Sequence, residues 1–563
     1  MSTDAMPVDH RPDFDAPDFD AVVIGAGFAG LYALYRLRDE LGLSVRVYET
    51  GDGVGGTWYW NRYPGARCDS ESFYYSYSFS DELQQEWVWS SKYPEQPEIL
   101  SYLNHVADRF DLRRDIQLET RVTSAVFEED ADLWQVTTER GDVVTARFLI
   151  SAVGCLSAAN VPAIPGLDTY EGEWYHTAAW PHDGVDFSGK RVGQIGTGST
   201  GIQAAPVIAA GADHLWVFQR TPNYTVPARN HDMTPEQDAA IKADYARIRR
   251  KARRSFGGFP YDASDKGALE VTDEERLATY ERLWEEEGGF KFIYGSYNDI
   301  LINKASNDTA ADFIRAKIGE IVKDPEVARR LMPTDYPYGT KRPPIDTDYY
   351  QTFNRDNVTL VDLRETPITE ITPKGIRTTG AEYELDMIVF ATGFDAMTGS
   401  LLKIDVRGRN GLSLRDKWAD GPTTYLGMQI AGFPNLFVIT GPGSPSVLAN
   451  MPMAIEQHVE WIGDCITRLR ETGMTAVEAT EQAEEGWVDH VRSIAEVTLF
   501  PLANSWYVGA NIPGKKRVFM PYVGGFAPYE KQCNDVAAKG YEGFVFSNLS
   551  AQSAQAGAGG QGA

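Results

Sequence analysis

Two glycine fingerprints constrain this chain more than any other feature of its sequence. They are Gly25-x-Gly27-x-x-Gly30 and Gly196-x-Gly198-x-x-Gly201. Each follows an apolar run and opens a helical pattern, which is the context in which such glycines let the backbone approach a pyrophosphate at a helix N-terminus. One such motif is weak evidence. Two with matching context predict a chain that binds two dinucleotides.

The residue that ends the following strand differs in charge between the two units. Glu49 and Arg220 lie at the same distance after the first glycine of their fingerprints. A carboxylate there accepts hydrogen bonds from ribose hydroxyls, whereas a guanidinium fits a 2′-phosphate. Thr221 adjoins Arg220, and Lys341 is a second candidate for the phosphate. The pair predicts FAD at the first site, NADPH at the second and a redox function.

Hydrophobic periodicity around both fingerprints predicts the same strand–helix–strand order. In the first unit we expect a strand over 21–24, a helix over 28–41 and a strand over 45–48. In the second we expect a strand over 191–195, a helix over 200–210 and a strand over 214–218. The predicted fold class is therefore α/β, with two Rossmann-like dinucleotide-binding domains and a helical insertion.

The insertion is predicted from dense charge and legible helix starts. Thr272 with Glu275 fits a capping box, and Asp324 precedes Pro325 as a capping residue would. The expected organisation is an N-terminal disordered segment over 1–19, an FAD domain over 20–155 and 385–547, an NADPH domain over 156–230 and 335–384, the helical insertion over 231–334, and a disordered tail over 548–563.

Composition excludes several function classes. The net charge of −27 argues against nucleic acid or an anionic membrane as a partner. The uncharged stretch 421–455 contains five prolines, so we expect buried strands and a loop there instead of a membrane span. Four widely separated cysteines predict neither a metal site nor a redox disulfide, and the N-terminus lacks a signal peptide, so we expect a cytoplasmic protein.

One basic cluster runs against the acidic balance of the chain. It consists of Arg247, Arg249, Arg250, Lys251, Arg253 and Arg254. We interpret it as a solvated helix face that pairs with nearby acids, and an anion-binding patch is the alternative.

A third motif lies between the fingerprints, and it resembles the signature of the type I Baeyer–Villiger monooxygenases. It reads Tyr170-x-Gly172-x-x-x-His176-x-x-x-Trp180-Pro181, with Tyr170 where the family has Phe. Trp180 separates it from related flavin monooxygenases that oxygenate nitrogen or sulfur, which have Tyr or Phe there. The resemblance implies that His176 is a hinge or structural residue that couples the two cofactor domains, not an acid–base group.

Two further stretches carry the same resemblance, which spans residues 20–546 and is closest to phenylacetone and steroid monooxygenases. They are Gly55-Gly56-Thr57-Trp58 with Tyr63-Pro64-Gly65 and Asp69, and 390–395 with its Ala-Thr-Gly core. The resemblance implies that NADPH reduces FAD, that O2 then gives an anionic peroxyflavin, and that this attacks a ketone to yield an ester or lactone.

The resemblance also implies site residues. Arg342 would supply the positive charge that a peroxide anion needs, with Asp69 as its anchor. The remaining residues are Gly56, Trp58, Asp69 and Tyr75 for FAD; Thr197, Ser199, Arg342 and Trp506 for NADP; and Ser446, Val447 and Leu448 for the substrate pocket. Pro343 and Pro344 depart from the family's aliphatic pair. No metal is expected, and the partners are a ketone and O2, with a monomer or weak homo-oligomer as the assembly.

Three other functions stay open at this point. A flavin monooxygenase acting on amines or sulfides is the first, and Trp180 and Arg342 argue against it. A flavin disulfide reductase would need a second cysteine beside Cys68. A catalytically silent flavin-binding or electron-transfer protein is the third.

Overall fold

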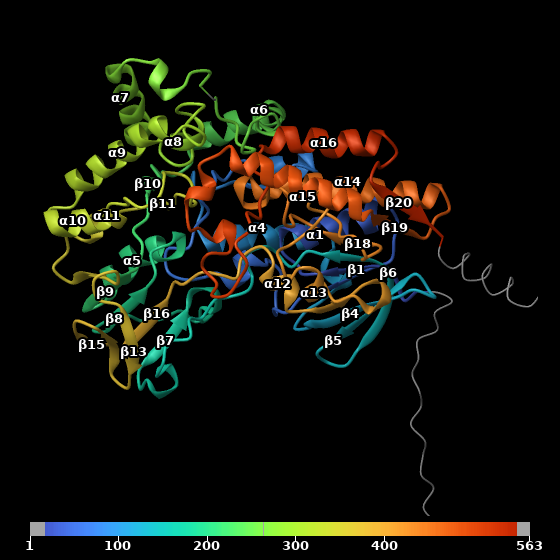
Figure 1. The fold of residues 1–563 in the computed structure, drawn as a ribbon, viewed down its shortest axis with the longest axis horizontal. Helices are drawn as coiled ribbons and strands as arrows, with labels where there is room; N and C mark the ends of the chain where they lie inside the picture. The colour runs from blue at the N-terminus through green and yellow to red at the C-terminus, as the bar shows by residue number, and fades with distance from the viewer. Residues whose placement is uncertain (1–16, 263, 549–563) are drawn as a thin grey trace, which may run out of the picture.

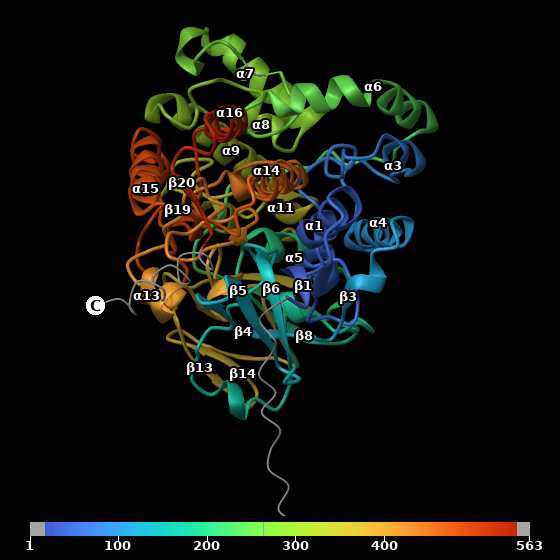
Figure 2. The same cartoon turned by 90° about the vertical axis from the view of Figure 1, so that its right-hand side faces the viewer.

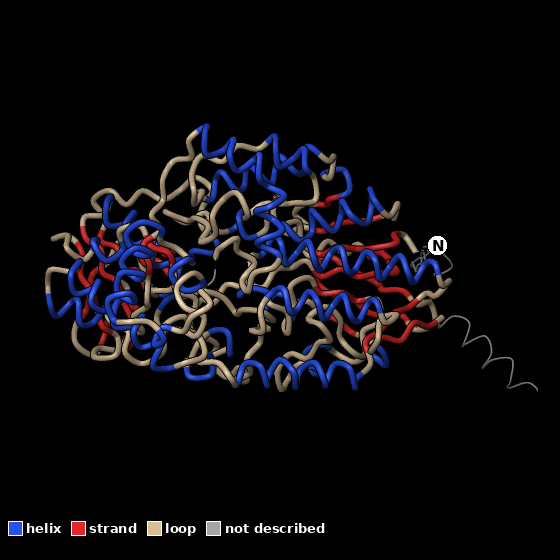
Figure 3. The backbone as a smooth tube through the Cα atoms, turned by 90° about the horizontal axis from the view of Figure 1, so that it is seen from above, coloured by secondary structure: helices blue, strands red, loops and turns tan. Residues whose placement is uncertain are grey.

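The computed structural model describes residues 17–262 and 264–548, and within them two sheets lie at opposite ends of the molecule with helices and loops between (Figure 3). The predicted disordered ends fall largely outside the described residues: 1–16 and 549–563 lie beyond them. None of the described helices is long and apolar enough to cross a bilayer.

The larger sheet is built from both halves of the chain. Its strand order is β17-β4-β5-β6-β1-β2-β3, and β18 also pairs with β6. The strands are β1 (Phe19–Ile24), β2 (Val45–Tyr48), β3 (Ile116–Gln117), β4 (Val122–Glu128), β5 (Leu133–Thr138), β6 (Val143–Ser151), β17 (Asp405–Arg407) and β18 (Leu436–Val438). The β1–β2, β1–β6 and β6–β18 pairs are parallel, so their carboxyl ends meet at one edge.

Helices cover this sheet because its central strands are apolar on both faces. Val22 and Val23 of β1 point to opposite faces, and both are fully buried. Helix α1 (Phe28–Tyr35) packs against α14 (Met451–Glu471), above β1 in Figure 2. Further elements of this half are α2 (Thr57–Trp60), α3 (Asp81–Glu86), α4 (Gln96–Arg109), α15 (Glu481–Glu496), α16 (Phe526–Ala538), β19 (Ala476–Ala479) and β20 (Phe544–Ser547).

The second sheet has five parallel strands in the order β12-β9-β8-β16-β7. They are β7 (Glu173–His176), β8 (Arg191–Ile195), β9 (His214–Gln219), β12 (Val358–Asp362) and β16 (Met387–Phe390). Helix α5 (Ser199–Gly211) follows β8, as the second fingerprint predicts. A small antiparallel sheet, β13 (Ile368–Thr372), β14 (Gly375–Thr378) and β15 (Glu382–Glu384), lies beside it.

The predicted insertion is helical and forms the upper left of Figure 1. Its helices are α6 (Pro235–Arg253), α7 (Asp273–Arg282), α8 (Lys291–Tyr294), α9 (Lys304–Ile321) and α10 (Pro325–Leu331). The predicted starts are present: Thr272 Oγ1 accepts from the Glu275 backbone N–H, and Asp324 accepts from two backbone N–H groups of α10. These side chains satisfy donors that a helix leaves free at its first turn.

Two local predictions differ from the structure. The helix expected over 28–41 changes at residue 36 from α1 into a π-helix, Arg36–Glu40. The uncharged stretch 421–455 holds a single short strand, β18, and its last residues begin α14, with Pro452 in the first helical turn, where a proline costs no hydrogen bond.

Candidate active site

The first fingerprint brings two backbone segments into close contact. Gly25 has φ +104°, and a Cβ there would lie 2.6 Å from the Ala152 carbonyl oxygen. A Cβ on Gly56 would lie 2.8 Å from the Gly27 Cα, so neither position has room for a side chain. Gly27 is the N-cap of α1 and provides no capping side chain, and Gly30 lies in the first turn. The backbone N–H groups of that turn therefore keep their hydrogen-bonding capacity for an anion.

Glu49 is held at this same turn. It follows β2, is 5% exposed, and accepts from the Ala26 N–H at 2.8 Å and from the Gly51 N–H at 2.8 Å. Each carboxylate oxygen keeps a further lone pair, which fits the expected acceptance from ribose hydroxyls.

Trp58 and Tyr75 are hydrogen-bonded neighbours. The Trp58 indole N–H donates to Tyr75 Oη at 3.1 Å, and Trp58 belongs to the short helix α2 that follows Gly56. Burial raises the pKa of Tyr75, so its hydroxyl stays protonated. Of the other residues predicted for FAD, Trp58 and Tyr75 thus lie near the turn between β1 and α1, with the Tyr75 ring centroid 5.4 Å from that of Phe28, whereas Asp69 lies beside Arg342.

The second fingerprint repeats the geometry with one difference. Gly196 has φ +111°, and a Cβ there would lie 2.3 Å from the Ala391 carbonyl oxygen. A Cβ on Gly198 would meet nothing within 4 Å, so open space lies above the N-terminus of α5. Thr197 Oγ1 donates to the Thr221 carbonyl oxygen at 2.9 Å, while Ser199 and Gly201 lie in the first turn of α5.

Arg220 and Lys341 lie close enough to repel each other. Burial lowers the pKa of Lys341; the Asp335 carboxylate opposes that shift, and the Arg220 charge adds to it. The Lys341 ammonium lies 4.2 Å from the centroid of the Tyr336 ring, and Arg220 is exposed beside it. Two cations in this position are well suited to a phosphate dianion.

Arg342 is held at three points. Its Nε donates to Asp69 Oδ2 at 3.2 Å, its Nη1 donates to the Val447 carbonyl oxygen at 2.9 Å, and the guanidinium lies 4.7 Å from the Phe290 ring centroid. Burial raises the pKa of Asp69, and Arg342 partly offsets that rise. Burial lowers the pKa of Arg342, but Asp69 together with Tyr507 and Tyr294 outweighs that effect, so the pKa is raised and the guanidinium stays charged.

Gln203 joins this site from α5, and the sequence reasoning did not find it. Its Nε2 donates to Asp69 Oδ1 at 3.3 Å and to the Arg67 carbonyl oxygen at 3.1 Å, while its Oε1 accepts from Tyr63 Oη at 2.7 Å. No local pattern marks such a residue, because its partners lie far away in the sequence. The available signal is its place on the helix that follows the second fingerprint.

A narrow pocket of about 20 Å³ lies against Arg342. The predicted Val447 and Leu448 line it, as does Pro343, whereas Ser446 is buried outside it with its Oγ 3.8 Å from Met397 Sδ. Most of the remaining lining is aromatic or aliphatic and comes from the insertion and from the C-terminal loops: Phe259, Phe290, Ile293, Tyr294, Leu301, Phe500 and Tyr507. These residues carry no motif and were not predicted.

Trp506 lies next to this pocket. It starts a 3-10 helix over Trp506–Val508, and its ring centroid is 4.3 Å from that of Tyr507, which lines the pocket. Trp506 itself is half-buried.

His176 links the end of β7 to the segment after β16. Its Nδ1 accepts from the Ala178 N–H at 3.1 Å, which places the proton on Nε2, 3.3 Å from Thr392 Oγ1. Thr392 in turn donates to the Asn160 carbonyl oxygen at 2.6 Å. Burial lowers the pKa of His176, so the ring is neutral and makes structural hydrogen bonds.

The aromatic residues at the two ends of the third motif are structural contacts. Trp180 is buried between Tyr175 and Phe187, with ring centroids 5.5 and 6.2 Å away. Tyr170 uses the hydroxyl that a phenylalanine would lack: its Oη donates to the Leu385 carbonyl oxygen at 3.0 Å. The described residues contain no group of three or more potential metal-binding side chains, and all four cysteines are buried and unpaired.

Comparison with known proteins places the whole chain among flavin enzymes. Residues 20–250 match the family model described as flavin-binding monooxygenase-like. The chain is 49% identical over 532 residues to a Baeyer-Villiger monooxygenase of Pseudooceanicola batsensis, covering 94% of this chain and 96% of that protein. It is 47% identical to the phenazine N-monooxygenase PhzNO1 of Lysobacter antibioticus, over 95% of this chain and 98% of that protein.

Solved structures agree with these relatives. An oxidized steroid monooxygenase bound to NADP superposes with a TM-score of 0.90 at 56% identity, covering 94% of this chain and 99% of that one. A closed cyclohexanone monooxygenase superposes with a TM-score of 0.92 at 49% identity over the same shares.

Proposed function

We propose a reaction for this chain, which belongs to the flavin-binding Baeyer–Villiger monooxygenases. The reaction consumes a ketone, O2, NADPH and a proton, and it gives an ester or lactone, NADP⁺ and water. One oxygen atom of O2 enters the bond between the carbonyl carbon and its neighbour, and the other leaves as water.

The observation that carries this proposal is the placement of Arg342. A guanidinium fixed by Asp69 and by the Val447 carbonyl oxygen lies at the wall of an apolar pocket. Such a fixed charge in a water-poor site stabilises an anion that develops there far more than it would in water. Bound FAD, once reduced by NADPH, supplies the oxygen atom taken from O2.

The chain's own residues would then act by binding and positioning. Gly25, Gly27 and the N-terminus of α1 receive the FAD pyrophosphate, and Glu49 receives the ribose. Gly196, Gly198 and the N-terminus of α5 do the same for NADPH.

Arg220, Thr221 and Lys341 would receive the 2′-phosphate of NADPH, because two cations converge there. Arg342 holds negative charge beside the substrate carbonyl. The aromatic wall around it excludes water, and Trp506 adjoins that wall through Tyr507.

Oxygenation of nitrogen is the second candidate. The 47% identity to a phenazine N-monooxygenase favours it, because that likeness spans nearly the whole of both chains. Transfer of oxygen to a nitrogen or sulfur lone pair creates no anion on the substrate and so has less need of a fixed cation. The position of Arg342 therefore favours ketones.

The test is product analysis under ¹⁸O2. Purified protein loaded with FAD and NADPH should convert phenylacetone or a cyclic ketone into an ester that carries one ¹⁸O atom. Methyl phenyl sulfide and phenazine, supplied under the same conditions, report the second candidate. NADPH consumption with hydrogen peroxide as the sole oxygen product would contradict both.

We also propose the division of labour along the chain that the sequence indicates. Residues 20–155 and 385–547 would bind FAD, residues 156–230 and 335–384 would bind NADPH, and 231–334 would shape the substrate pocket. The support is that each fingerprint turn belongs to a different sheet.

We further propose a cytoplasmic location and a monomeric or weakly associated state. Four buried, unpaired cysteines fit a reducing compartment. Cell fractionation and sedimentation of the purified protein test these two points.

A further inference from the structure

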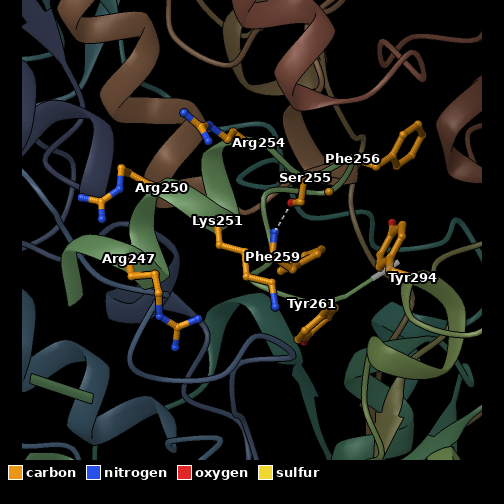
Figure 4. Close-up of a pocket in the computed structure, with 10 residues that line it drawn as sticks. Arg247, Arg250, Lys251, Arg254, Ser255, Phe256, Phe259, Tyr261 and Tyr294 are labelled. Atoms are coloured by element: carbon orange, nitrogen blue, oxygen red, sulfur yellow. Dashed lines mark hydrogen bonds between the residues drawn. The ribbon is translucent and has the colours of Figure 1, made fainter. Parts of the chain in front are cut away.

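A second and larger pocket opens beside α6 and is lined by the basic cluster. Its volume is about 530 Å³, and its cationic lining is Arg247, Arg250, Lys251 and Arg254, with Phe259 and Tyr294 on the inner side (Figure 4). We call this the basic vestibule. These four positions recur at helical spacing, so one face of the end of α6 presents all of them.

The other two arginines of the cluster have structural roles elsewhere. Arg249 donates to the carbonyl oxygens of Tyr74, Ser76 and Tyr77, which docks α6 onto the larger sheet's half of the molecule. Arg253 forms ion pairs with Glu460 and Glu530. Arg249 and Arg253 are therefore accounted for by contacts within the fold, whereas these contacts do not account for the four cations that line the vestibule.

The vestibule cations are only partly neutralised. Arg247 pairs with Asp244, and Lys251 pairs with Asp262, whose side chain is 93% exposed. Among the described residues no carboxylate lies within ion-pair distance of Arg250 or Arg254, and both are exposed. Within the vestibule, the predicted pairing of the basic helix face with nearby acids therefore holds for Arg247 and Lys251 and not for Arg250 and Arg254.

This arrangement costs stability in the free protein. Like charges three or four residues apart on a helix repel each other, and Arg250 has Arg247 and Arg254 at those distances. The helix C-terminus offsets part of that repulsion, because its carbonyl ends favour cations. In a chain whose net charge is −27, a cluster in which two of four cations are unpaired focuses positive potential into one cleft.

The vestibule and the pocket at Arg342 share a wall. Phe259 and Tyr294 line both pockets. Behind them Phe290 stacks under the Arg342 guanidinium, and its ring centroid lies 5.5 Å from that of Phe259 and 6.2 Å from that of Tyr294. Aromatic side chains thus separate a molecule in the vestibule from Arg342.

The sizes of the two pockets indicate the direction of entry. The pocket at Arg342 has room for about one water molecule. A ketone needs more room than that beside the guanidinium, and the vestibule is the space on the other side of the shared aromatic wall. An apolar wall at the inner end and guanidinium groups at the outer end favour a ligand that is apolar at one end and anionic at the other.

We propose that the basic vestibule binds the anionic tail of the substrate, so that the preferred substrates are ketones bearing a carboxylate or a phosphate group away from the carbonyl. This inference rests on the proposed ketone oxygenation and names its substrate class. Arg250 and Arg254 receive the anion, since a guanidinium matches both carboxylate and phosphate geometry with paired hydrogen bonds. The carbonyl end passes Phe259 and Tyr294 toward Arg342.

The experiment compares matched substrates that differ in tail charge alone. Methyl-ketone fatty acids of increasing chain length are paired with their methyl esters, and kcat/KM is measured on the holoenzyme at low and high salt. We expect the acid to be preferred about tenfold at the best chain length, with the preference shrinking as salt screens the vestibule. Comparing kcat/KM for the best keto acid with that for its CoA thioester distinguishes a carboxylate tail from a phosphorylated carrier. A preference for either over the methyl ester fits the proposal.

Variants locate the effect. Arg250→Ala combined with Arg254→Ala should bring the acid-to-ester ratio close to one and leave the methyl ester rate unchanged. Arg492→Ala, which removes an exposed arginine of α15 paired with Asp489, is the control for loss of a surface arginine outside the vestibule and should leave the ratio as in wild type. An unchanged ratio in the double variant, or a ratio near one in wild type, would overturn the proposal.

A binding measurement keeps this result separate from the proposed reaction. The hydroxy acids that correspond to the whole keto-acid series cannot be oxygenated as ketones, and the Kd of each is measured by calorimetry on wild type and the double variant, independently of any activity. We expect about fivefold or more weaker binding in the variant and no change for the hydroxy ester. If no ketone is oxygenated, the proposed function fails, but the Kd values still test whether the vestibule binds the anionic tail. Equal Kd values in wild type and the double variant would refute anion binding there.

Discussion

Asp69 accepts hydrogen bonds from two distant parts of the chain at once: Gln203 Nε2 lies 3.3 Å from its Oδ1, and Arg342 Nε lies 3.2 Å from its Oδ2. Gln203 belongs to α5, whose N-terminus carries the second fingerprint. The carboxylate that positions the guanidinium is thereby itself positioned by the helix expected to receive NADPH. A shift of α5 on nucleotide binding would reach Arg342 through two side chains, Gln203 and Asp69.

Replacing Gln203 should loosen that positioning. Gln203→Met removes the amide and keeps the length, so Asp69 loses one donor, an interaction worth about 1 kcal/mol. We expect NADPH to reduce the flavin at nearly the wild-type rate while ester formed per NADPH consumed falls about fivefold. Tyr63→Phe is the matched control, because it removes a bond to Gln203 Oε1 and leaves Asp69 untouched. Equal loss in both variants would assign Gln203 a merely structural role.

Arg342→Ala should separate the two half-reactions. Flavin reduction by NADPH stays measurable by loss of absorbance, whereas ester formation falls by about 10²–10³, as expected when a fixed charge at a developing anion is removed. Arg342→Lys keeps a charge but loses the fork that contacts Asp69 and Val447, so it should recover a small part of the activity. Wild-type ester yield from the alanine variant would remove Arg342 from the reaction.

The pair Arg220 and Lys341 should decide the choice of nicotinamide cofactor. Arg220→Ala removes one of two cations at the proposed phosphate site, and we expect the KM for NADPH to rise about tenfold or more with little change for NADH. Lys341→Ala should act in the same direction. Steady-state kinetics with both cofactors checks this, and a rise of equal size for NADH would contradict the phosphate assignment.

His458 should make stability depend on pH. It is fully buried on α14, and burial lowers its pKa to about 3 from 6.5; its Nδ1 accepts from the Thr440 N–H. Between these two values the unfolded chain binds a proton that the folded protein excludes, so the free energy of unfolding falls as pH drops below 6.5. From pH 7 to pH 5 this single group removes about 2 kcal/mol.

The check is the difference in melting temperature between pH 7 and pH 5. His458→Asn removes the titrating group, so the variant should show a smaller loss between the two pH values than wild type, even if it is less stable at both. An identical loss in the two proteins would show that groups other than His458 cause the decrease in stability between pH 7 and pH 5.

What the sequence could predict was local. Both fingerprint turns, the place of Glu49 and the caps at Thr272 and Asp324 follow from backbone rules that act over a few residues. The ion pair of Arg342 with Asp69 came from family resemblance, because no local rule joins residues so far apart in the chain. Its geometry agrees with the structure, whereas its chemical role stays a prediction.

The missed residues share a different physical cause. Gln203 lies within α5, Tyr294 ends the short helix α8 and Phe290 precedes that helix, and all three contact partners on other elements. A buried aromatic residue packs inward whether or not it lines a pocket. The change from α1 to a π-helix at Arg36 has no signal in hydrophobic spacing either, because Leu31, Leu34, Leu37 and Leu41 recur as they would in one continuous α-helix.

The pairing of β18 with β6 constrains the order in which the two sheets can be completed during synthesis. Leu436–Val438 adds to a strand that ends at Ser151, so a ribosome must release almost three hundred further residues before that edge is filled. All strands of the five-stranded sheet lie between these two positions in the sequence, so this sheet can form before β18 has been synthesised and the larger sheet is complete. A chain truncated after residue 390 would therefore contain the complete five-stranded sheet together with a β6 edge that lacks β18, and an unpaired strand edge promotes aggregation.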